Sequence, residues 1–161
     1  KKAEAAGIEA LGKALSGEGG RNMVKLEYAK RLKRYLPLTI SELKEQKSGR
    51  KQDLARIVSA ETGELLQRLP RDGFTSALDQ RGKSLSSEQL AALLDEHMLR
   101  STPEWTLVIG GPYGLGGELL ERADLVLSLS PLTLTHQMAR LLLLEQLYRG
   151  CTIIRNEPYH H

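Results

Sequence analysis

The stretch Trp105-Thr106-Leu107-Val108-Ile109-Gly110-Gly111-Pro112-Tyr113-Gly114 decides the fold class. Its first five residues form a short apolar run typical of a buried strand, and glycines follow at once. Glycine lets a backbone approach a ligand closely, and in α/β proteins ligands bind at the loops that follow buried strands. However, the turn is neither a GxGxxG fingerprint nor a Walker A motif, and Pro112 removes an amide that a phosphate site would use. Taken alone, this pattern slightly favours a tight structural turn.

Strands and helices alternate on both sides of this stretch. Ser86 and Gln89 have the spacing of a capping box, and Asn22 is a candidate N-cap. We expect helices over 23–36, 54–69, 86–99, 118–122 and 135–149, strands over 38–43, 74–79, 105–109 and 125–129, and a loop over 80–83. Residues 8–11 fit a short strand about as well as a helix. The alternation predicts a single α/β domain over 1–161, with a mainly parallel sheet and helices on both faces.

Composition limits the class of protein without naming a function. The 161 residues are 40% apolar and 27% charged, as in ordinary globular domains, and the net charge is only +3. The single cysteine, Cys151, excludes an internal disulfide and fits a reducing compartment. No signal peptide is evident near Lys1, and the run Leu141–Leu144 is too short to span a bilayer, so we expect a cytoplasmic protein that binds no membrane.

Positive charge gathers on one face of the helix expected over 23–36. Val24, Tyr28 and Leu32 mark its apolar face, and five basic residues occupy the other side: Lys25, Lys30, Arg31, Lys33 and Arg34. A solvated face explains any single one of these charges. The cluster also fits a surface that faces RNA, so both interpretations stay open.

Two further segments of the last third carry candidate binding residues. The loop Leu127–Thr133 is polar without an ionisable group, which suits backbone hydrogen bonds to a neutral ring such as adenine, or equally an ordinary helix cap. The helix after it is apolar nearly all round, which predicts a subunit interface. Arg140 and Arg149 on that helix are candidate anion ligands. No Cys/His pattern has zinc spacing, so we expect no metal site.

The chain ends in Pro158-Tyr159-His160-His161. A Tyr ring stacks on bases, and a His exchanges a proton near neutral pH, although two terminal histidines are also what a purification tag leaves behind. Read in order, Ile109–Gly114, Leu127–Met138, Glu145–Arg149 and this ending closely resemble the ribosomal RNA large subunit methyltransferase H family of the SPOUT superfamily. The Tyr-His-His ending belongs to the pattern of that family, which argues against the tag.

The resemblance implies a fold, a cofactor and a substrate. It implies a C-terminal deep trefoil knot, a homodimer, S-adenosylmethionine as methyl donor, and methylation of N3 of a pseudouridine in helix 69 of large-subunit rRNA. The cofactor-binding positions that it implies are Leu78, Gly111, Ser130, Pro131, Leu132, Thr133, Leu134 and Thr135. At the N-terminus the chain departs from the family, because Ile8–Lys13 matches its hydrophobic first strand poorly and residues 1–22 are atypical.

The reaction assigns expected roles to the remaining candidates. N3 must lose its proton before its lone pair attacks the methyl group, and holding the two reactants together supplies much of the rate. The expected catalytic residues are His160, Tyr159 and Arg140, and the expected RNA-binding residues are Arg149, His161 and His136. Which subunit's tail completes each site is left open. The alternative function is a non-catalytic RNA-binding or ribosome-assembly module on the same fold.

Overall fold

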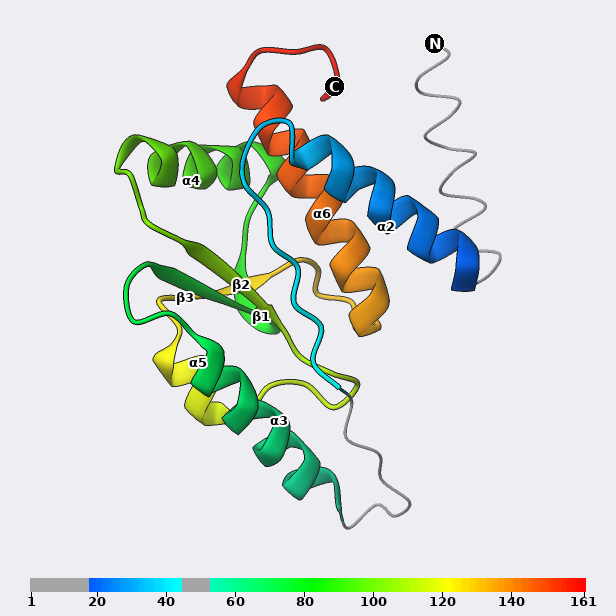
Figure 1. The fold of residues 1–161 in the computed structure, drawn as a ribbon, viewed down its shortest axis with the longest axis vertical. Helices are drawn as coiled ribbons and strands as arrows, with labels where there is room; N and C mark the ends of the chain where they lie inside the picture. The colour runs from blue at the N-terminus through cyan, green and yellow to red at the C-terminus, as the bar shows by residue number, and fades with distance from the viewer. Residues whose placement is uncertain (1–17, 45–52) are drawn as a thin grey trace.

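A computed structural model describes residues 18–44 and 53–161 of the chain (Figure 1). The predicted alternation of helices and strands is confirmed over this part, whereas the segment expected near 8–11 lies outside it. The helices are α2 (Glu18–Leu32), α3 (Leu54–Arg68), α4 (Ser87–Leu99), α5 (Gly117–Arg122) and α6 (His136–Ile154). The strands are β1 (Phe74–Ser84), β2 (Trp105–Ile109) and β3 (Leu125–Ser128).

The three strands form one parallel sheet in the order β2-β1-β3. Phe74 pairs with Trp105 at one end of the β1–β2 ladder and Leu78 with Ile109 at the other. On its other side β1 pairs with β3, beginning at Ser76 opposite Leu125. Helix α4 connects β1 to β2 and α5 connects β2 to β3, as parallel strands require. All three strands therefore present their carboxyl ends at the same edge.

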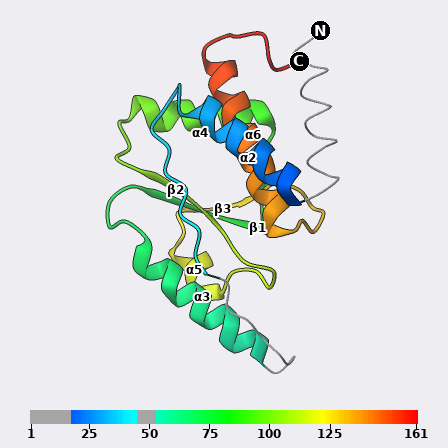
Figure 2. The same ribbon diagram turned by 45° about the vertical axis from the view of Figure 1, so that its right-hand side comes forward.

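Helices cover both faces of the sheet, as predicted. Helices α2, α4 and α6 lie on one side and α3 and α5 on the other, and the turned view shows the same layers (Figures 1 and 2). On the first side Leu32, Leu94 and Leu147 belong to one buried cluster. On the second side Ala77 and Leu119 belong to another. Apolar side chains of β1 and β2 thus alternate between two cores.

Strand β1 continues through residues 80–83, so the loop predicted there is wrong. After Leu78, which pairs with Leu127, the register shifts and Lys83 pairs with that same residue. The shift brings the backbone of Gly82 against β3: a Cβ on Gly82 would lie 2.6 Å from the carbonyl carbon of Val126. Only glycine fits such a close approach of two backbones.

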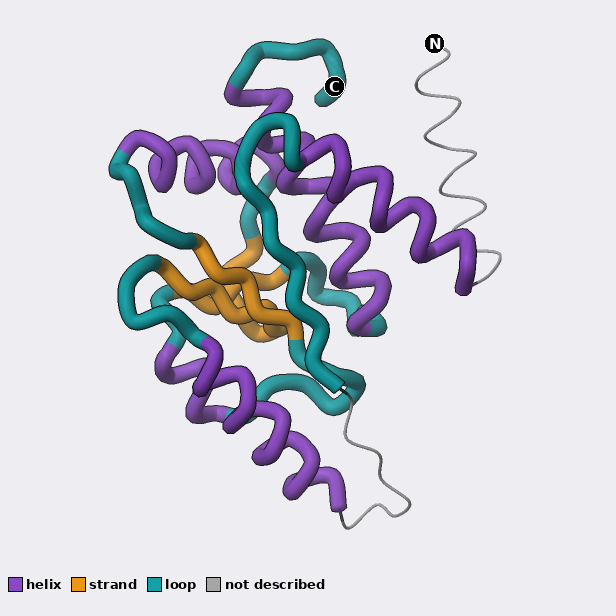
Figure 3. Tube along the Cα trace, in the orientation of Figure 1, coloured by secondary structure: helices purple, strands orange, loops and turns teal. Residues whose placement is uncertain are grey.

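Two predictions for residues that precede the sheet in the sequence are also wrong: the strand over 38–43 and the N-cap at Asn22. Residues 38–43 lie extended beside the sheet without forming a strand, because no described strand pairs with them (Figure 3). Helix α2 begins at Glu18, so Asn22 lies inside it and is no N-cap. An N-cap is the non-helical residue before a helix, whereas a full turn of α2 precedes Asn22; beyond it Val24 and Tyr28 pack against Leu141 of α6.

The predicted starts of helices α4 and α6 agree with the structure. Ser86 and Gln89 form the expected capping box at the start of α4. Helix α6 begins after the Thr135 cap, as predicted, but runs past Arg149 to Ile154 because its last turn is buried. Gly150 lies close to the Ala91 backbone and lets α4 and α6 pack tightly. Cys151, 1% exposed, belongs to this packing, and burial raises the pKa of its thiol to about 11.

Candidate functional site

A pocket of about 340 Å³ opens where residues 78–81 of β1 meet the loop after β2 and the loop between β3 and α6. The loop after β2 is a tight turn, in which the Gly114 amide donates to the Gly111 carbonyl oxygen over 3.1 Å. Gly114 has a φ of 84°, a conformation that glycine adopts without strain. The turn is therefore structural, as its sequence favoured, and it also lines the pocket.

The loop between β3 and α6 is held by its own polar side chains. Ser128 Oγ donates to the Ser130 carbonyl oxygen over 3.0 Å, and Ser130 Oγ accepts from the Leu132 amide over 3.0 Å. Thr133 Oγ1 donates to Gln80 Oε1 over 3.0 Å and so ties the loop to β1. Thr135 Oγ1 caps α6 by accepting from an amide of its first turn. The loop thus serves both as a helix cap and as a wall of the pocket.

Most of the expected cofactor positions line this one pocket. Leu78, Gly111, Ser130, Leu132, Thr133 and Leu134 do so, together with His136. The lining does not include Pro131 or Thr135, which belong to the same loop. Residues of strand β1 and of two separate loops therefore converge on one space. Its volume lies in the usual range for small-molecule sites, about 300–1,000 Å³.

Sequence reasoning missed a charged pair on the rim of the pocket. Arg81 donates to both carboxylate oxygens of Asp79, through Nε over 2.8 Å and Nη2 over 2.9 Å. The hydrogen bond from Arg81 holds the pKa of Asp79 below its usual range, so this carboxylate stays ionised. The pair was hidden by the prediction of a loop at 80–83, which gave the Arg81 side chain no defined direction.

The C-terminal tail (157–161) lies at the opposite end of α6 from this pocket (Figure 1). Helix α6 has 19 residues, so its ends are about 27 Å apart at 1.5 Å per residue. The tail folds back over the end of α6 toward α2 and α4. The Tyr159 ring packs edge-on against the Tyr148 ring of α6, with centroids 4.7 Å apart. Within one chain, Tyr159 and His160 are not brought to the pocket.

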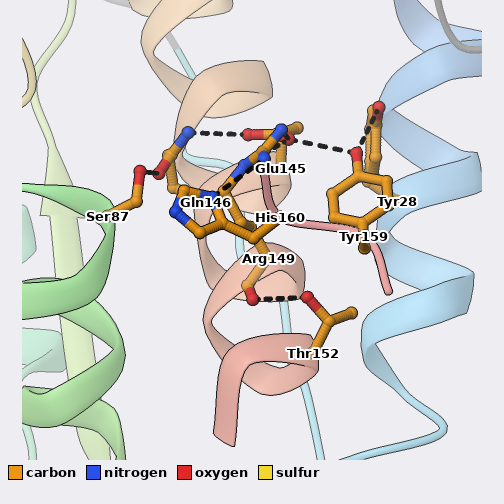
Figure 4. A network of polar contacts seen from close by, with 8 residues as sticks. All are labelled: Tyr28, Ser87, Glu145, Gln146, Arg149, Thr152, Tyr159 and His160. Atoms are coloured by element: carbon orange, nitrogen blue, oxygen red, sulfur yellow. Dashed lines mark hydrogen bonds and ion pairs between the residues drawn. The ribbon is translucent and has the colours of Figure 1, made fainter. Parts of the chain in front are cut away.

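Glu145 of α6 organises the tail (Figure 4). Its Oε1 accepts hydrogen bonds from Arg149 Nη2 over 2.6 Å and from the Tyr159 hydroxyl over 3.1 Å. The Arg149 guanidinium also lies over the Tyr159 ring, 4.8 Å from its centroid. Burial and the bonds to Tyr28 and Glu145 raise the pKa of Tyr159, so its hydroxyl stays protonated. Tyr159 is therefore suited to donate a hydrogen bond and poorly suited to accept a proton.

His160 is held from both sides. Arg149 Nη1 lies 3.2 Å from His160 Nδ1, and Glu88 Oε1 of α4 lies 2.8 Å from His160 Nε2. Arg149 and His160 were expected to work near each other, and the structure brings them into contact. Glu88 and Glu145 were not anticipated. Glu145 was within reach of sequence reasoning, because it stands four residues before Arg149 on one helix.

The other expected residues lie apart from the tail. Arg140 is on the first half of α6, where its Nη1 contacts Glu42 Oε1 at 3.3 Å. It lines a second pocket, of about 350 Å³, beside residues 38–44. His136 lies at the start of α6 and lines both pockets. His161 is exposed at the chain end. Arg140 and His136 thus belong to the pocket end of α6, and His160, Tyr159 and Arg149 to the tail end.

The amino-acid sequence of this chain is similar to those of known proteins. A family model described as "Predicted SPOUT methyltransferase" matches residues 12–160. The chain belongs to the SPOUT methyltransferase family. A protein of Syntrophotalea carbinolica named ribosomal RNA large subunit methyltransferase H is 60% identical over 135 residues, which cover 84% of this chain and 86% of the relative. Proteins of the same name from Trichlorobacter lovleyi and Geobacter sulfurreducens are 46% and 45% identical, with the same shares covered.

These matches place the chain, within the SPOUT methyltransferases, in the ribosomal RNA large subunit methyltransferase H family. In the parts that the structure describes, His, Cys, Asp and Glu side chains form no cluster of three or more that could hold a metal ion. None of the helices described there combines the length and the apolar character needed to cross a membrane.

Proposed function

We propose that this SPOUT methyltransferase transfers a methyl group from S-adenosylmethionine to N3 of a pseudouridine in helix 69 of large-subunit rRNA. The observation that carries the proposal is the convergence of six expected cofactor positions on one pocket at the carboxyl edge of a parallel sheet. The names of the relatives support rRNA as the substrate. The nucleotide and the atom follow from the family resemblance of the sequence.

The donor set of the pocket suits S-adenosylmethionine. Leu78, Ile109 and Leu134 offer apolar walls for an adenine ring and a methionine chain. The Asp79 carboxylate on the rim is paired with Arg81, so this arginine adds no unbalanced positive charge beside a sulfonium. The turn Gly111–Gly114 offers no phosphate cradle, because Pro112 has no amide hydrogen. When bound, the cofactor supplies a methyl group made electrophilic by its sulfonium. The residues present therefore fit a methyl donor better than a nucleotide phosphate.

The tail residues would act on the base. Neutral His160 is the candidate acceptor for the N3 proton, once Arg149 leaves its Nδ1 atom. Tyr159, which stays protonated, would donate a hydrogen bond to a uracil oxygen or stack on the ring. Arg149 is suited to a phosphate or a uracil oxygen because a guanidinium presents several donors. With its proton removed by His160, N3 would be free to attack the methyl group that the cofactor would supply.

The separation of tail and pocket supports a homodimer. The tail of one chain and its own pocket lie at opposite ends of α6, so we infer that the tail of one subunit completes the pocket of the other. Exposed apolar side chains on α2, Met23 and Leu26, are available to bury in such an interface. We also propose the family's C-terminal trefoil knot, and a cytoplasmic site of action, where rRNA is modified.

Methyl transfer to defined rRNA tests the proposal. Purified protein, S-adenosylmethionine and ribosomes lacking this methyl group should yield one new methyl on a pseudouridine in helix 69, located by mass spectrometry of rRNA fragments. A pocket-filling substitution, Ala139→Phe, should weaken cofactor binding at least about tenfold in calorimetry, because Ala139 lines the pocket. Ala92→Phe, at an exposed position of α4, is the matched control. A wild-type protein that binds rRNA but shows no heat with the cofactor would be the non-catalytic module instead.

A further inference from the structure

The first turn of α4 reaches the catalytic tail. Glu88 stands in this turn, and its Oε1 atom is 2.8 Å from Nε2 of His160, 72 residues away in sequence. The hydrogen bond with His160 is the main cause that lowers the pKa of Glu88, so the carboxylate is ionised near neutral pH. The turn itself is fixed by the Ser86–Gln89 capping box. Glu88 is thus a charged acceptor on a rigid support.

The contacts of His160 define which nitrogen carries its proton. An arginine side chain only donates hydrogen bonds, so Nδ1 of His160 must accept from Arg149. A neutral imidazole then carries its hydrogen on Nε2, which donates to Glu88. Together the two neighbours select the Nε2–H tautomer and orient the Nδ1 lone pair toward Arg149.

The same turn of α4 also supports the other tail contacts (Figure 4). Ser87 Oγ donates to Gln146 Oε1 over 2.6 Å, and Gln146 Nε2 donates to Glu145 Oε2 over 2.8 Å. Glu145 in turn binds Arg149 and Tyr159. Two adjacent residues of α4 therefore begin two paths that meet at Arg149, one through His160 and one through Glu145. The ring of contacts is closed.

We propose that Glu88 is a positioning residue for His160, which keeps the imidazole in the Nε2–H tautomer, so that its Nδ1 lone pair can receive the N3 proton once Arg149 has moved away. Glu88 does not touch the substrate in this role. It acts by removing alternative orientations and the alternative tautomer of the histidine. The role rests on the proposed function, because it matters for the rate only if His160 takes part in methyl transfer.

Three variants of the full-length chain test the role. Glu88→Ala should slow single-turnover methyl transfer at saturating cofactor about tenfold, since small misplacements of a reacting group are costly, and should leave the Kd for S-adenosylmethionine unchanged. Glu88→Gln keeps an oxygen that accepts from Nε2–H and should recover most of the rate. Glu96→Ala removes the same charge from α4, where Glu96 pairs with Arg100 away from the tail, and should match the wild type. Equal rates for Glu88→Ala and Glu96→Ala would overturn the proposal, as would an equal loss in cofactor affinity.

A second readout does not depend on activity. Long-range ¹H–¹⁵N correlation spectra of the imidazoles report which ring nitrogen carries the hydrogen, and His160→Gln identifies the signals of that residue. We expect the Nε2–H form for His160 in the wild type and in Glu88→Gln, and a mixture of tautomers in Glu88→Ala. Identical spectra for wild type and Glu88→Ala would refute the link. If the wild type transferred no methyl group, the proposed function would fail, and these spectra would still decide the role of Glu88.

Discussion

The Tyr35 hydroxyl donates a hydrogen bond of 2.6 Å to Glu157 Oε2, which joins the turn after α2 to the first residue of the tail. Arg155 lies over the Tyr35 ring, 5.1 Å from its centroid, and adds a second contact at the same place. Tyr35 and Glu157 are 122 residues apart in sequence. The tail is thus anchored where it leaves α6 as well as at Tyr159 and His160.

Loss of this anchor should cost stability in a pH-dependent way. Tyr35→Phe should lower the free energy of unfolding by about 0.5–1.5 kcal/mol. The bond to Glu157 raises the pKa of Tyr35 from 10.0 to about 12, so its contribution is complete below pH 10 and is lost as the pH rises through 12. Urea unfolding of wild type and variant between pH 8 and pH 12 measures it. Tyr148→Phe, whose hydroxyl has no hydrogen bond among the described residues, is the control, and an equal loss there would contradict the assignment.

Two glycines in different surroundings should respond oppositely to alanine. Gly82→Ala should destabilise the protein by about 2–3 kcal/mol, because its Cβ would lie 2.6 Å from the backbone of Val126. Gly63→Ala should stabilise it by about 0.5–1 kcal/mol, because Gly63 is inside α3 and its Cβ would meet nothing within 4 Å. Urea unfolding measures both. A tolerated Gly82→Ala would show that β1 and β3 are not packed this closely.

Acid should weaken the fold through His97. This side chain lies between the rings of Phe74 and Trp105, with ring centroids at 4.6 and 4.8 Å, and its buried Nε2 has no hydrogen-bond partner in the part of the chain that the structure describes. Burial lowers the pKa of His97 below 6.5, so the unfolded chain binds a proton first as the pH falls. Its contribution to stability is therefore present above pH 6.5 and is lost as the pH drops through the folded-state pKa.

The measurement for His97 compares two proteins at two pH values. The difference in free energy of unfolding between pH 8 and pH 5 should be smaller in His97→Leu than in the wild type. Every other titratable group is present in both proteins, so its contribution cancels in this comparison. An unchanged difference would mean that the His97 ring is solvated in the folded protein.

Mixed dimers should reveal which subunit supplies the tail. Ala139→Phe blocks the pocket and keeps the tail, whereas His160→Ala keeps the pocket and loses the imidazole. If the tail acts on the partner, a dimer with one subunit of each kind has one intact site and should show about half the wild-type rate. If each tail serves its own chain, the mixed dimer should be as inactive as the two parent dimers. Methyl transfer by separately tagged, co-purified heterodimers distinguishes the two.

Features that depend on neighbouring residues were predicted from the sequence. Features that depend on contacts between distant segments, such as strand pairing, were not. The Ser86–Gln89 capping box depends on residues three apart, and both its partners were readable. The strand expected over 38–43 had the right alternation, but a strand needs a neighbour, and pairing is not a local property. The extension of β1 through Gly82 depends on β3, more than forty residues downstream.

The candidate site divides in the same way. The pocket loops follow their strands directly, so the sequence order alone indicated that Gly111 and Ser130 lie at loops where a ligand could bind, and both line one pocket. The partner of His160 on α4 had no signal at all, because Glu88 is an ordinary exposed residue of a helix until the tail folds over it. Arg140 and Arg149 share one helix, yet nine residues of rise, about 13 Å, put them in different surroundings.

The reactivity of Cys151 can report local opening of the structure around the end of α6. It is the only cysteine in the chain, its side chain is 1% exposed, and its thiol, with a pKa of about 11, is almost entirely protonated at neutral pH. A thiol reagent should therefore modify the native protein only when the end of α6 separates from α2 and α4. Labelling rates at pH 8, with and without S-adenosylmethionine, would measure how often the end of α6, the helix between the pocket and the tail, separates from its neighbours.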